Sequence, residues 1–247
     1  MKRWAENGVG QADAAATVPV ALWAMRTGGR SFSGGNPSDA VVLTAEEAAA
    51  CARFLRPEDA ELCRAARGLV RRALSAHLRV PSETIALGRD PGGKPRLAGL
   101  DPPALRFNLS HARGLVVLAV VADASVEPGI DVEPLDRPVG PGLLSTALAP
   151  SEAAALAAMS EPARPAAFLR LWTMKEAVLK AAGVGLAAAP AEVVCRLDPP
   201  ALSALPHELG EPLDFALLPL AFGMSHVGTL AIRDPARRGV RPLWAAA

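Results

Sequence analysis

The chain has no tyrosine, and aromatic residues make up only 4% of its 247 positions. It also lacks a dominant charge, since 26 lysines and arginines stand against 25 aspartates and glutamates, for a formal net charge of +1. Nucleic-acid-binding surfaces depend on clustered basic charge and often on aromatic stacking, and anionic membranes attract net positive charge. The composition therefore argues against a nucleic-acid binder or a membrane-surface protein.

Cysteine is also scarce. Cys51, Cys63 and Cys195 form an odd count without any CxxC spacing, which argues against a disulfide framework or a zinc site and fits a reducing compartment. No apolar stretch approaches the roughly 20 residues that cross a bilayer, and the N-terminus lacks the apolar core of a signal peptide. We therefore expect a cytoplasmic protein that does not contact membranes.

The order of expected elements follows from hydrophobic periodicity and capping patterns. After a polar lead at residues 1–16, which we expect to be disordered, the patterns predict strands at 18–25, 105–107 and 115–121 and helices from residue 45, at 57–78 and at 165–182. Thr44 with Glu47 forms a capping-box pattern, and Gly183 follows the last helix as a C-terminal cap.

A short sequence echo indicates a repeated unit. Phe107-Asn108-Leu109-Ser110-His111 is similar to Phe222-Gly223-Met224-Ser225-His226, which lies close to half the chain later, and a long helix precedes each copy. A duplicated α+β unit explains this pattern. We therefore predict an N-terminal lobe at 17–122 and a C-terminal lobe at 123–247, each a small antiparallel sheet packed on a long helix, with a site at their interface.

Two carboxylates alternate in the apolar run from Gly129 to Glu133. In a strand, Asp131 and Glu133 project from the same face, and two neighbouring anions are unfavourable unless a cation lies between them. Mg²⁺ is bound by oxygen ligands of this kind. The alternative is an exposed strand end between Pro128 and Pro134 whose carboxylates are solvated, and these residues alone leave the two interpretations open.

Three side chains of the second long helix share one face, because Trp172, Glu176 and Lys180 recur at i, i+4 and i+8. A surface ion pair beside a core tryptophan would explain this spacing. It does not explain why the neighbouring face is apolar while this stripe carries the charges. In the functional interpretation, Glu176 completes a metal site or accepts a proton, and Lys180 contacts a phosphate.

Two shorter segments add candidate phosphate contacts. His111, next to Ser110, suits a phosphate hydrogen bond or a proton transfer, although an isolated histidine is more often structural. Lys94 follows Gly92-Gly93 in a tight turn, where it is either a solvated lysine or an anion contact. The chain has neither the GxSxG of a hydrolase nor the GxxxxGK[ST] of a phosphate-binding loop.

These segments, in this order, resemble the 4′-phosphopantetheinyl transferases of the large, two-lobed Sfp type. The matching stretches are Gly93-Lys94-Pro95, Phe107 to His111, Gly129 to Glu133, Trp172 to Ala177 with Lys180, and Gly183 to Leu186. The resemblance implies two similar lobes in a pseudo-twofold arrangement within a monomer. It also implies transfer of the phosphopantetheine arm of coenzyme A to a serine hydroxyl of an apo acyl or peptidyl carrier protein, with release of adenosine 3′,5′-bisphosphate.

The resemblance further assigns roles to residues. It implies that Asp131, Glu133 and Glu176 bind Mg²⁺ together with the coenzyme A pyrophosphate. It makes Asp131, Glu176 and Lys180 the catalytic residues, with Glu176 helping to deprotonate the carrier serine and Lys180 stabilising charge on the transferring phosphate. The implied ligands of the coenzyme A phosphates are Lys94, Ser110, His111, Lys180 and Arg64.

The chain departs from the family pattern at Ala112, where a serine is common, and at Glu47 and Ala50, where lysines are expected. Two other functions compete with the implied one. A different Mg²⁺-dependent phosphotransferase predicts a phosphate-binding glycine loop, which is missing. If the chain were an inactive carrier-binding module, we would expect the loss of a carboxylate or of Lys180. The sequence retains Asp131, Glu133, Glu176 and Lys180. We also expect a basic docking surface for an acidic carrier on Arg64, Arg67, Arg71 or Arg72.

Overall fold

The computed structural model describes residues 17–28, 43–90, 92–99, 105–185 and 188–245. The predicted disordered lead lies outside these residues. The helices are α1 (Ala45–Ala52), α2 (Pro57–Leu78), α3 (Pro141–Ala147), α4 (Pro150–Ala157) and α5 (Arg164–Ala182). The strands are β1 (Thr17–Arg26), β2 (Leu87–Arg89), β3 (Pro95–Leu97), β4 (Arg106–Ala112), β5 (Leu115–Val121), β6 (Glu127–Pro134), β7 (Val194–Leu197), β8 (Pro200–Ala204), β9 (Phe215–Phe222), β10 (His226–Arg233) and β11 (Gly239–Trp244).

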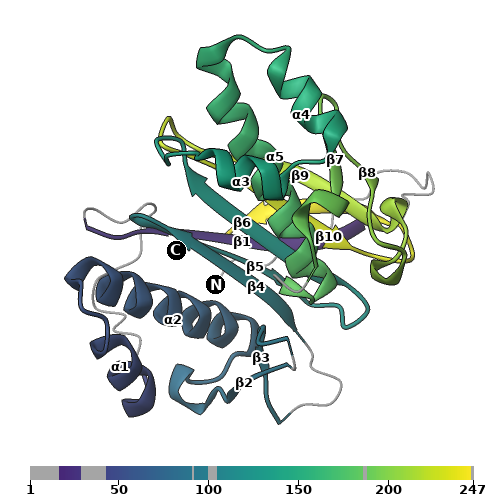
Figure 1. The fold of residues 1–247 in the computed structure, drawn as a ribbon. Coiled ribbons are helices and arrows are strands. Elements are labelled where there is room, and N and C mark those ends of the chain that lie inside the picture. The colour runs from purple at the N-terminus through teal and green to yellow at the C-terminus, as the bar shows by residue number, and fades with distance from the viewer. Residues whose placement is uncertain (1–16, 29–42, 91, 100–104, 186–187, 246–247) are drawn as a thin grey trace.

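The N-terminal half is a four-stranded sheet, in the order β11-β1-β5-β4, with α2 against one face (Figure 1). Every residue of β5 is buried, because both faces of this sheet are covered. Val116, Leu118 and Val120 pack toward α2. Val117 and Ala119 pack on the other face, against residues of the second sheet. A strand covered on both faces reads as a continuous apolar run, as the sequence of β5 does.

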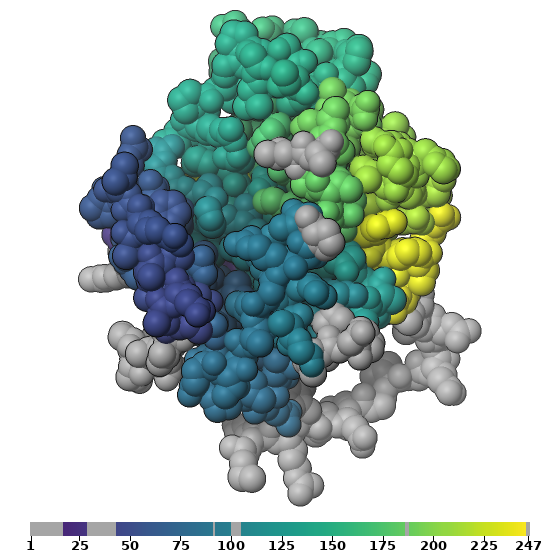
Figure 2. Space-filling model, turned by 60° about the horizontal axis from the view of Figure 1, so that its bottom comes forward, coloured from purple at the N-terminus to yellow at the C-terminus, as the bar shows by residue number. Residues whose placement is uncertain are grey.

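The C-terminal half is a three-stranded antiparallel sheet, in the order β6-β10-β9, covered by α5. Along β10, Val227 and Ala231 pack toward α5. Leu230 and Ile232 pack in the opposite direction, against the N-terminal sheet. The molecule therefore has four layers, helix, sheet, sheet and helix, and β6 lies where the halves meet (Figure 1). In the space-filling view, blue N-terminal residues and green and yellow C-terminal residues occupy different sides (Figure 2).

This architecture confirms the predicted α+β class with two similar lobes, each a small sheet on a long helix. The sequence echo, however, does not occupy equivalent positions. Ser110 and His111 lie within β4, before the turn of the β4–β5 hairpin, whereas Ser225 is the last residue of the β9–β10 turn and His226 is the first residue of β10. In addition, β11 pairs in parallel with β1 in the N-terminal sheet. The lobe limits at 17–122 and 123–247 stay a prediction.

The local capping predictions agree with the structure. The Thr44 hydroxyl accepts a hydrogen bond from the backbone of Glu47, whose carboxylate accepts one from the backbone of Thr44. Helix α5 ends at Gly183, which has a left-handed φ of 78°. The Val184 N–H then donates to the Leu179 carbonyl at 3.2 Å, as in a helix-terminating Schellman motif.

Two expectations about the N-terminal half were wrong. Arg71 is buried, with 3% of its surface exposed, and donates to Glu47 at 2.7 Å and to the carbonyls of Ser82 and Ile85. It therefore cannot belong to an exposed docking surface. Cys51 and Cys63 form a disulfide between α1 and α2, because an odd cysteine count excludes complete pairing but not a single pair.

Membrane insertion was the other question raised by the composition. No helix in the described part of the chain is both long and apolar enough to span a bilayer.

Candidate active site between the two sheets

Asp131 is at the centre of the candidate site. Its side chain projects from β6 on the side of α5, and 6% of the residue is exposed. The Asp131 Oδ1 atom accepts hydrogen bonds from the Lys180 ammonium at 2.6 Å and from the Ser110 hydroxyl at 2.9 Å. The other oxygen, Oδ2, is buried without a hydrogen-bond partner. The structure therefore brings together three predicted site residues that come from β4, β6 and α5.

Glu133 lies two residues further along the same face of β6. Its Oε1 atom accepts a hydrogen bond from the Trp172 indole at 3.1 Å and forms an ion pair with Arg137. Burial raises the pKa of Glu133, and the Asp131 charge adds to this effect, while Arg137 opposes it. The alternation of residues along β6 thus places both carboxylates on the α5 side, as the sequence predicts.

Glu176 faces the same region from α5, one helical turn from both Trp172 and Lys180. Its Oε1 atom is buried and has no hydrogen-bond partner. Burial raises the pKa of Glu176, the Asp131 and Glu133 charges raise it further, and Lys180 lowers it. The three carboxylates are therefore close enough to act on one another electrostatically.

The donor set at this site fits a hard cation. Asp131 Oδ2 and Glu176 Oε1 are buried carboxylate oxygens without partners, and burying such atoms is costly unless a cation or a donor meets them. Within the described ranges, however, no three acidic, histidine or cysteine side chains are already gathered closely enough to hold a metal ion. Glu133 is instead bonded to Arg137 and Trp172.

Tight backbone packing brings α5 to β6. Gly129 lies under the helix, and a Cβ atom at this position would be 2.0 Å from the Ala177 carbonyl oxygen and 2.5 Å from the Ala181 nitrogen. Only glycine allows this approach. On the other side of β6, the Asn108 side chain accepts a hydrogen bond from the Ile130 N–H at 2.8 Å, which fixes β4 beside β6.

His111 lies at the end of β4, close enough to the site for its charges to act on it. Desolvation lowers the pKa of the His111 imidazole, and the Lys180 charge lowers it further, whereas Asp131 opposes this effect. The neutral ring can both donate and accept hydrogen bonds. His226, from the second copy of the echo, instead bonds to the Ser225 hydroxyl and the Arg113 carbonyl, where it joins the ends of the two hairpins.

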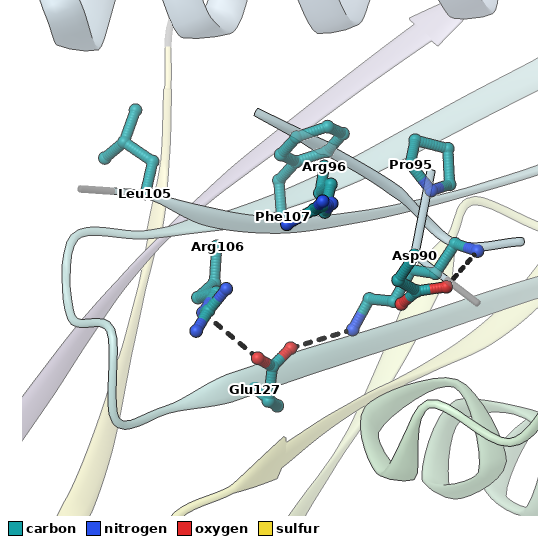
Figure 3. Close-up of a pocket in the computed structure, with 8 residues that line it drawn as sticks. Asp90, Pro95, Arg96, Leu105, Arg106, Phe107 and Glu127 are labelled. Atoms are coloured by element: carbon teal, nitrogen blue, oxygen red, sulfur yellow. Dashed lines mark hydrogen bonds and ion pairs between the residues drawn. The ribbon is translucent and has the colours of Figure 1, made fainter. Parts of the chain in front are cut away.

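The other two predicted phosphate ligands lie apart from the carboxylates. The Lys94 ammonium donates to Glu127 and to the carbonyls of Pro128 and Lys180, at 3.0, 3.0 and 3.1 Å. Glu127 also pairs with Arg106 (Figure 3), beside a cavity of about 150 Å³. Arg64 is exposed on α2, and no ion pair or hydrogen bond joins it to another residue of the described ranges.

Three contacts of the site were not anticipated from the sequence. They are the bond from Trp172 to Glu133, the ion pair of Arg137 with Glu133, and the bridge made by Asn108. The position of Arg137, four residues after Glu133, was a usable signal. Asn108 belongs to a segment that was singled out, but the alternation of β4 alone does not show which neighbouring backbone its amide meets.

Comparisons with known proteins point to one family for both halves of the chain. The family model described as 4′-phosphopantetheinyl transferase superfamily matches residues 127–216. A second model, described as 4′-phosphopantetheinyl transferase, N-terminal, matches residues 38–123. The first of these segments contains all three carboxylates and Lys180, and the second contains Ser110 and His111.

Several relatives have names that include phosphopantetheinyl transferase. The 4′-phosphopantetheinyl transferase HetI of Nostoc sp. is 34% identical over 151 residues, which are 60% of this chain and 62% of that protein. A 4′-phosphopantetheinyl transferase of Bacillus subtilis is 33% identical over 147 residues, 58% of this chain and 62% of the relative. The L-aminoadipate-semialdehyde dehydrogenase-phosphopantetheinyl transferase of Xenopus laevis is 32% identical over 158 residues, 55% of this chain and 52% of the relative.

The matched part of the chain thus spans less than two thirds of the length of these relatives. Both halves of the fold nevertheless match models of one family, and the matched segments contain the charged cluster between β6 and α5. The chain belongs to the 4′-phosphopantetheinyl transferase superfamily.

Proposed function

We propose that this protein transfers the 4′-phosphopantetheine arm of coenzyme A to a serine hydroxyl of an apo acyl or peptidyl carrier protein, as an enzyme of the Sfp type. The observation that carries the proposal is the cluster around Asp131. Lys180 and Ser110 bond to one oxygen of this carboxylate, its other oxygen has no partner, and an unpaired buried oxygen of Glu176 faces the same region. Such a site suits the binding of a metal and a diphosphate together.

The proposed ligands of Mg²⁺ are Asp131, Glu133 and Glu176, all of which supply the oxygen atoms that this ion prefers. When bound, Mg²⁺ would neutralise charge on the diphosphate of coenzyme A. Lys180 pairs with Asp131. From this position it would stabilise the charge that develops as the phosphorus–oxygen bond of coenzyme A breaks. Ser110 and His111 would contact the coenzyme A phosphates.

Lys94 and Arg64 complete the proposed coenzyme A ligands with different requirements. Lys94 would have to exchange at least one of its three present acceptors for a phosphate oxygen. Arg64 is exposed on α2 and needs no such exchange. Among the described residues, coenzyme A binding would therefore break a present contact of Lys94 but none of Arg64.

In the proposed reaction the carrier serine oxygen forms a bond to the β-phosphorus of coenzyme A. The bond from that phosphorus to the bridging oxygen breaks, and adenosine 3′,5′-bisphosphate leaves with the electron pair. The serine proton passes to Glu176, directly or through water. The Glu176 carboxylate can accept this proton because one of its buried oxygens has no hydrogen-bond partner among the described residues. Holding the reactants in place supplies much of the remaining acceleration.

The proposal also includes a monomer that acts in the cytoplasm on small-molecule and carrier substrates. The two lobes of one chain already form the interface at which the candidate site lies. A second copy is not needed to bring Ser110 from one lobe and Lys180 from the other to the same carboxylate.

A mass measurement tests the proposed function. The protein, Mg²⁺ and coenzyme A are incubated with apo acyl and peptidyl carrier domains, and the carrier is expected to gain the mass of one phosphopantetheine at its serine. Chelation of divalent cations should stop the gain. No gain on any carrier, with a known transferase active in parallel, would overturn the proposal.

Variants then test the role of Glu176. Glu176→Gln should lower turnover roughly 10²–10⁴-fold and leave coenzyme A binding, measured by calorimetry, largely unchanged. Glu161→Gln is the matched control, because Glu161 is an exposed carboxylate just before α5 that pairs with Arg164. Equal turnover of wild type and Glu176→Gln would remove Glu176 from the reaction.

A further inference from the structure

Arg137 has no part in the roles proposed above, yet it contacts the candidate metal site. It follows β6 in a turn, in which its N–H donates to the Pro134 carbonyl at 3.1 Å. Its guanidinium forms an ion pair with Glu133 Oε1 and lies 5.7 Å from the centre of the Trp172 ring. The Trp172 indole donates to the same oxygen. Two side chains therefore hold one carboxylate of the site.

Basic side chains of the protein pair with only two of the three described carboxylates of the site. Lys180 pairs with Asp131, and Arg137 pairs with Glu133. Among the described residues, Glu176 has no such pair, and one of its oxygens is buried without a partner. Without a metal, the protein thus supplies its own positive charge to two of the three proposed ligands. The Oε1 atom of Glu133, which accepts bonds from the guanidinium and the indole, is not free to bind a cation, and binding through this oxygen requires the ion pair to separate.

We propose that Arg137 competes internally with the divalent cation for Glu133. In the metal-free protein Arg137 holds Glu133 away from a common ligand position, and metal binding separates the two side chains. This inference rests on the proposed function only in that Asp131, Glu133 and Glu176 bind the metal. Arg137 is a positioning residue, since it acts through Glu133.

The Trp172 ring would still contact the Arg137 guanidinium after metal binding has separated it from Glu133. An arginine over an indole ring is attracted by the negative face of the ring, and the Arg137 guanidinium lies over Trp172 while its side chain is 32% exposed. The ring therefore favours Arg137 near the site after its carboxylate partner has turned toward the metal. The contact also makes separation of the pair less costly than full release of the guanidinium into water.

The competing explanation is an ordinary surface ion pair between residues four apart, which contributes little to stability. The two explanations predict opposite signs for metal affinity. If the pair only keeps Glu133 in place for the metal, the loss of Arg137 leaves affinity unchanged or weakens it. If Arg137 competes with the metal, its loss strengthens binding, because Glu133 no longer has to leave a partner.

The test measures binding of Mn²⁺ alone, without coenzyme A, by electron paramagnetic resonance of the free ion. Arg137→Gln should bind Mn²⁺ roughly two- to fivefold more tightly than wild type, which corresponds to the strength of a partly exposed ion pair. Arg137→Lys, which keeps the charge but not the fork geometry, should lie between the two. Arg113→Gln is the matched control, because Arg113 pairs with exposed Asp136 instead, and its affinity should equal that of wild type.

Thermal unfolding of each variant shows that the comparison concerns folded protein. Equal or weaker Mn²⁺ binding by Arg137→Gln would overturn the inference. Asp131→Asn supplies the independent check on the metal site, since it should abolish tight binding. If Asp131→Asn binds Mn²⁺ as wild type does, the metal site and the inference both fall. If carriers gain phosphopantetheine while Arg137→Gln shows no tighter binding, the inference alone fails.

Discussion

Helices α2 and α5 cover the two sheets from opposite sides, but the two helices differ in that α5 carries the proposed catalytic residues Glu176 and Lys180. Seven of the 22 residues of α2 are buried, compared with 11 of the 19 residues of α5. Each helix has one buried cation that joins it to its own lobe, Arg71 to Glu47 and Lys175 to Glu152. Helix α5 has a further charged stripe, Trp172, Glu176 and Lys180, which faces β6.

The comparison separates two uses of buried charge. Lys175 is fully buried and donates to the carbonyls of Pro190 and Val193 as well as to Glu152. All of its donors are satisfied, so it holds α5 in one rotation about its axis. The neighbouring residue Glu176 is left with an unsatisfied oxygen. A fully bonded charge stabilises a fold, whereas an incompletely bonded one at an interface is available to a ligand.

The largest expected difference is between substitutions of one basic residue in each helix, Lys180 in α5 and Arg71 in α2. Lys180→Met should lower the rate of phosphopantetheine transfer on the order of 10²–10³-fold, since it removes a donor to developing charge. Arg71→Met should instead lower the free energy of unfolding by roughly 3–5 kcal/mol, because it leaves Glu47 buried without its partner. Urea denaturation and the transfer assay measure the two effects. Equal loss of activity per folded molecule in both variants would contradict the division of roles.

The close approach of α5 to β6 gives the next largest effect. Gly129→Ala should destabilise the protein by roughly 3 kcal/mol or more, since the added Cβ would overlap the Ala177 carbonyl oxygen. Gly142→Ala in α3 is the control, because nothing lies within 4 Å of its added Cβ, and it should stabilise by roughly 0.5–1 kcal/mol. Denaturation of both variants in urea tests this, and similar stabilities would show that β6 and α5 adjust freely.

The two halves should also respond to pH in opposite ways. Burial alone would raise the pKa of Glu47, but the bond from Arg71 brings it below the usual 4.5, so the ionised group stabilises the fold above that value and less as pH falls. Burial raises the pKa of Glu176 above 4.5, so ionisation of this group costs stability as pH rises through 4.5 and beyond.

Without divalent cations at neutral pH, Glu47→Gln should therefore lower the melting temperature and Glu176→Gln should raise it. Both differences should shrink as the pH falls and the wild-type carboxyl groups become protonated, for Glu176 already above pH 4.5 and for Glu47 only below it. Melting curves at several pH values measure this. A lower melting temperature for Glu176→Gln at neutral pH would mean that its ionised form is stabilised by the metal-free protein.

Cysteine reactivity gives the smallest effect and separates the halves again. The disulfide joins α1 to α2, while Cys195 is free and buried in the C-terminal half. Burial raises the pKa of the Cys195 thiol to about 12, so the native protein should not react with a thiol reagent at neutral pH. After unfolding without reductant one thiol per chain should react, and with reductant all three. Three reactive thiols without reductant would show that the disulfide is not formed.

The sequence predicted those parts of the site that depend on local periodicity. The alternation along β6 placed Asp131 and Glu133 on one face, and the 3.6-residue period of α5 aligned Glu176 with Lys180. Contacts set by the path of a turn or by distant packing could not be read in this way. Arg137 reaches Glu133 because the chain turns back after Pro134, and the sequence pattern indicated only that a strand ends there.

Distant packing explains the other differences. Arg71 has the helical position of a half-exposed residue, but α1 brings Glu47 to it, so this arginine is buried. Lys94 stands in a glycine turn that would expose it, yet the ends of β6 and α5 supply three acceptors for its ammonium group. In both cases the partner is far along the chain, where no local periodicity indicates it.

Strand β11 has a consequence for movement between the halves. The chain leaves the C-terminal sheet after β10, and β11 then adds to the edge of the N-terminal sheet, where it pairs with β1 from Thr17 to Leu22. The chain therefore crosses between the halves a second time, and a hinge at the β5–β6 connection alone cannot let them swing apart. With both sheets intact, the halves could move apart only if the β5–β6 and β10–β11 connections bent together, so β11 restricts this movement more than a single connection would.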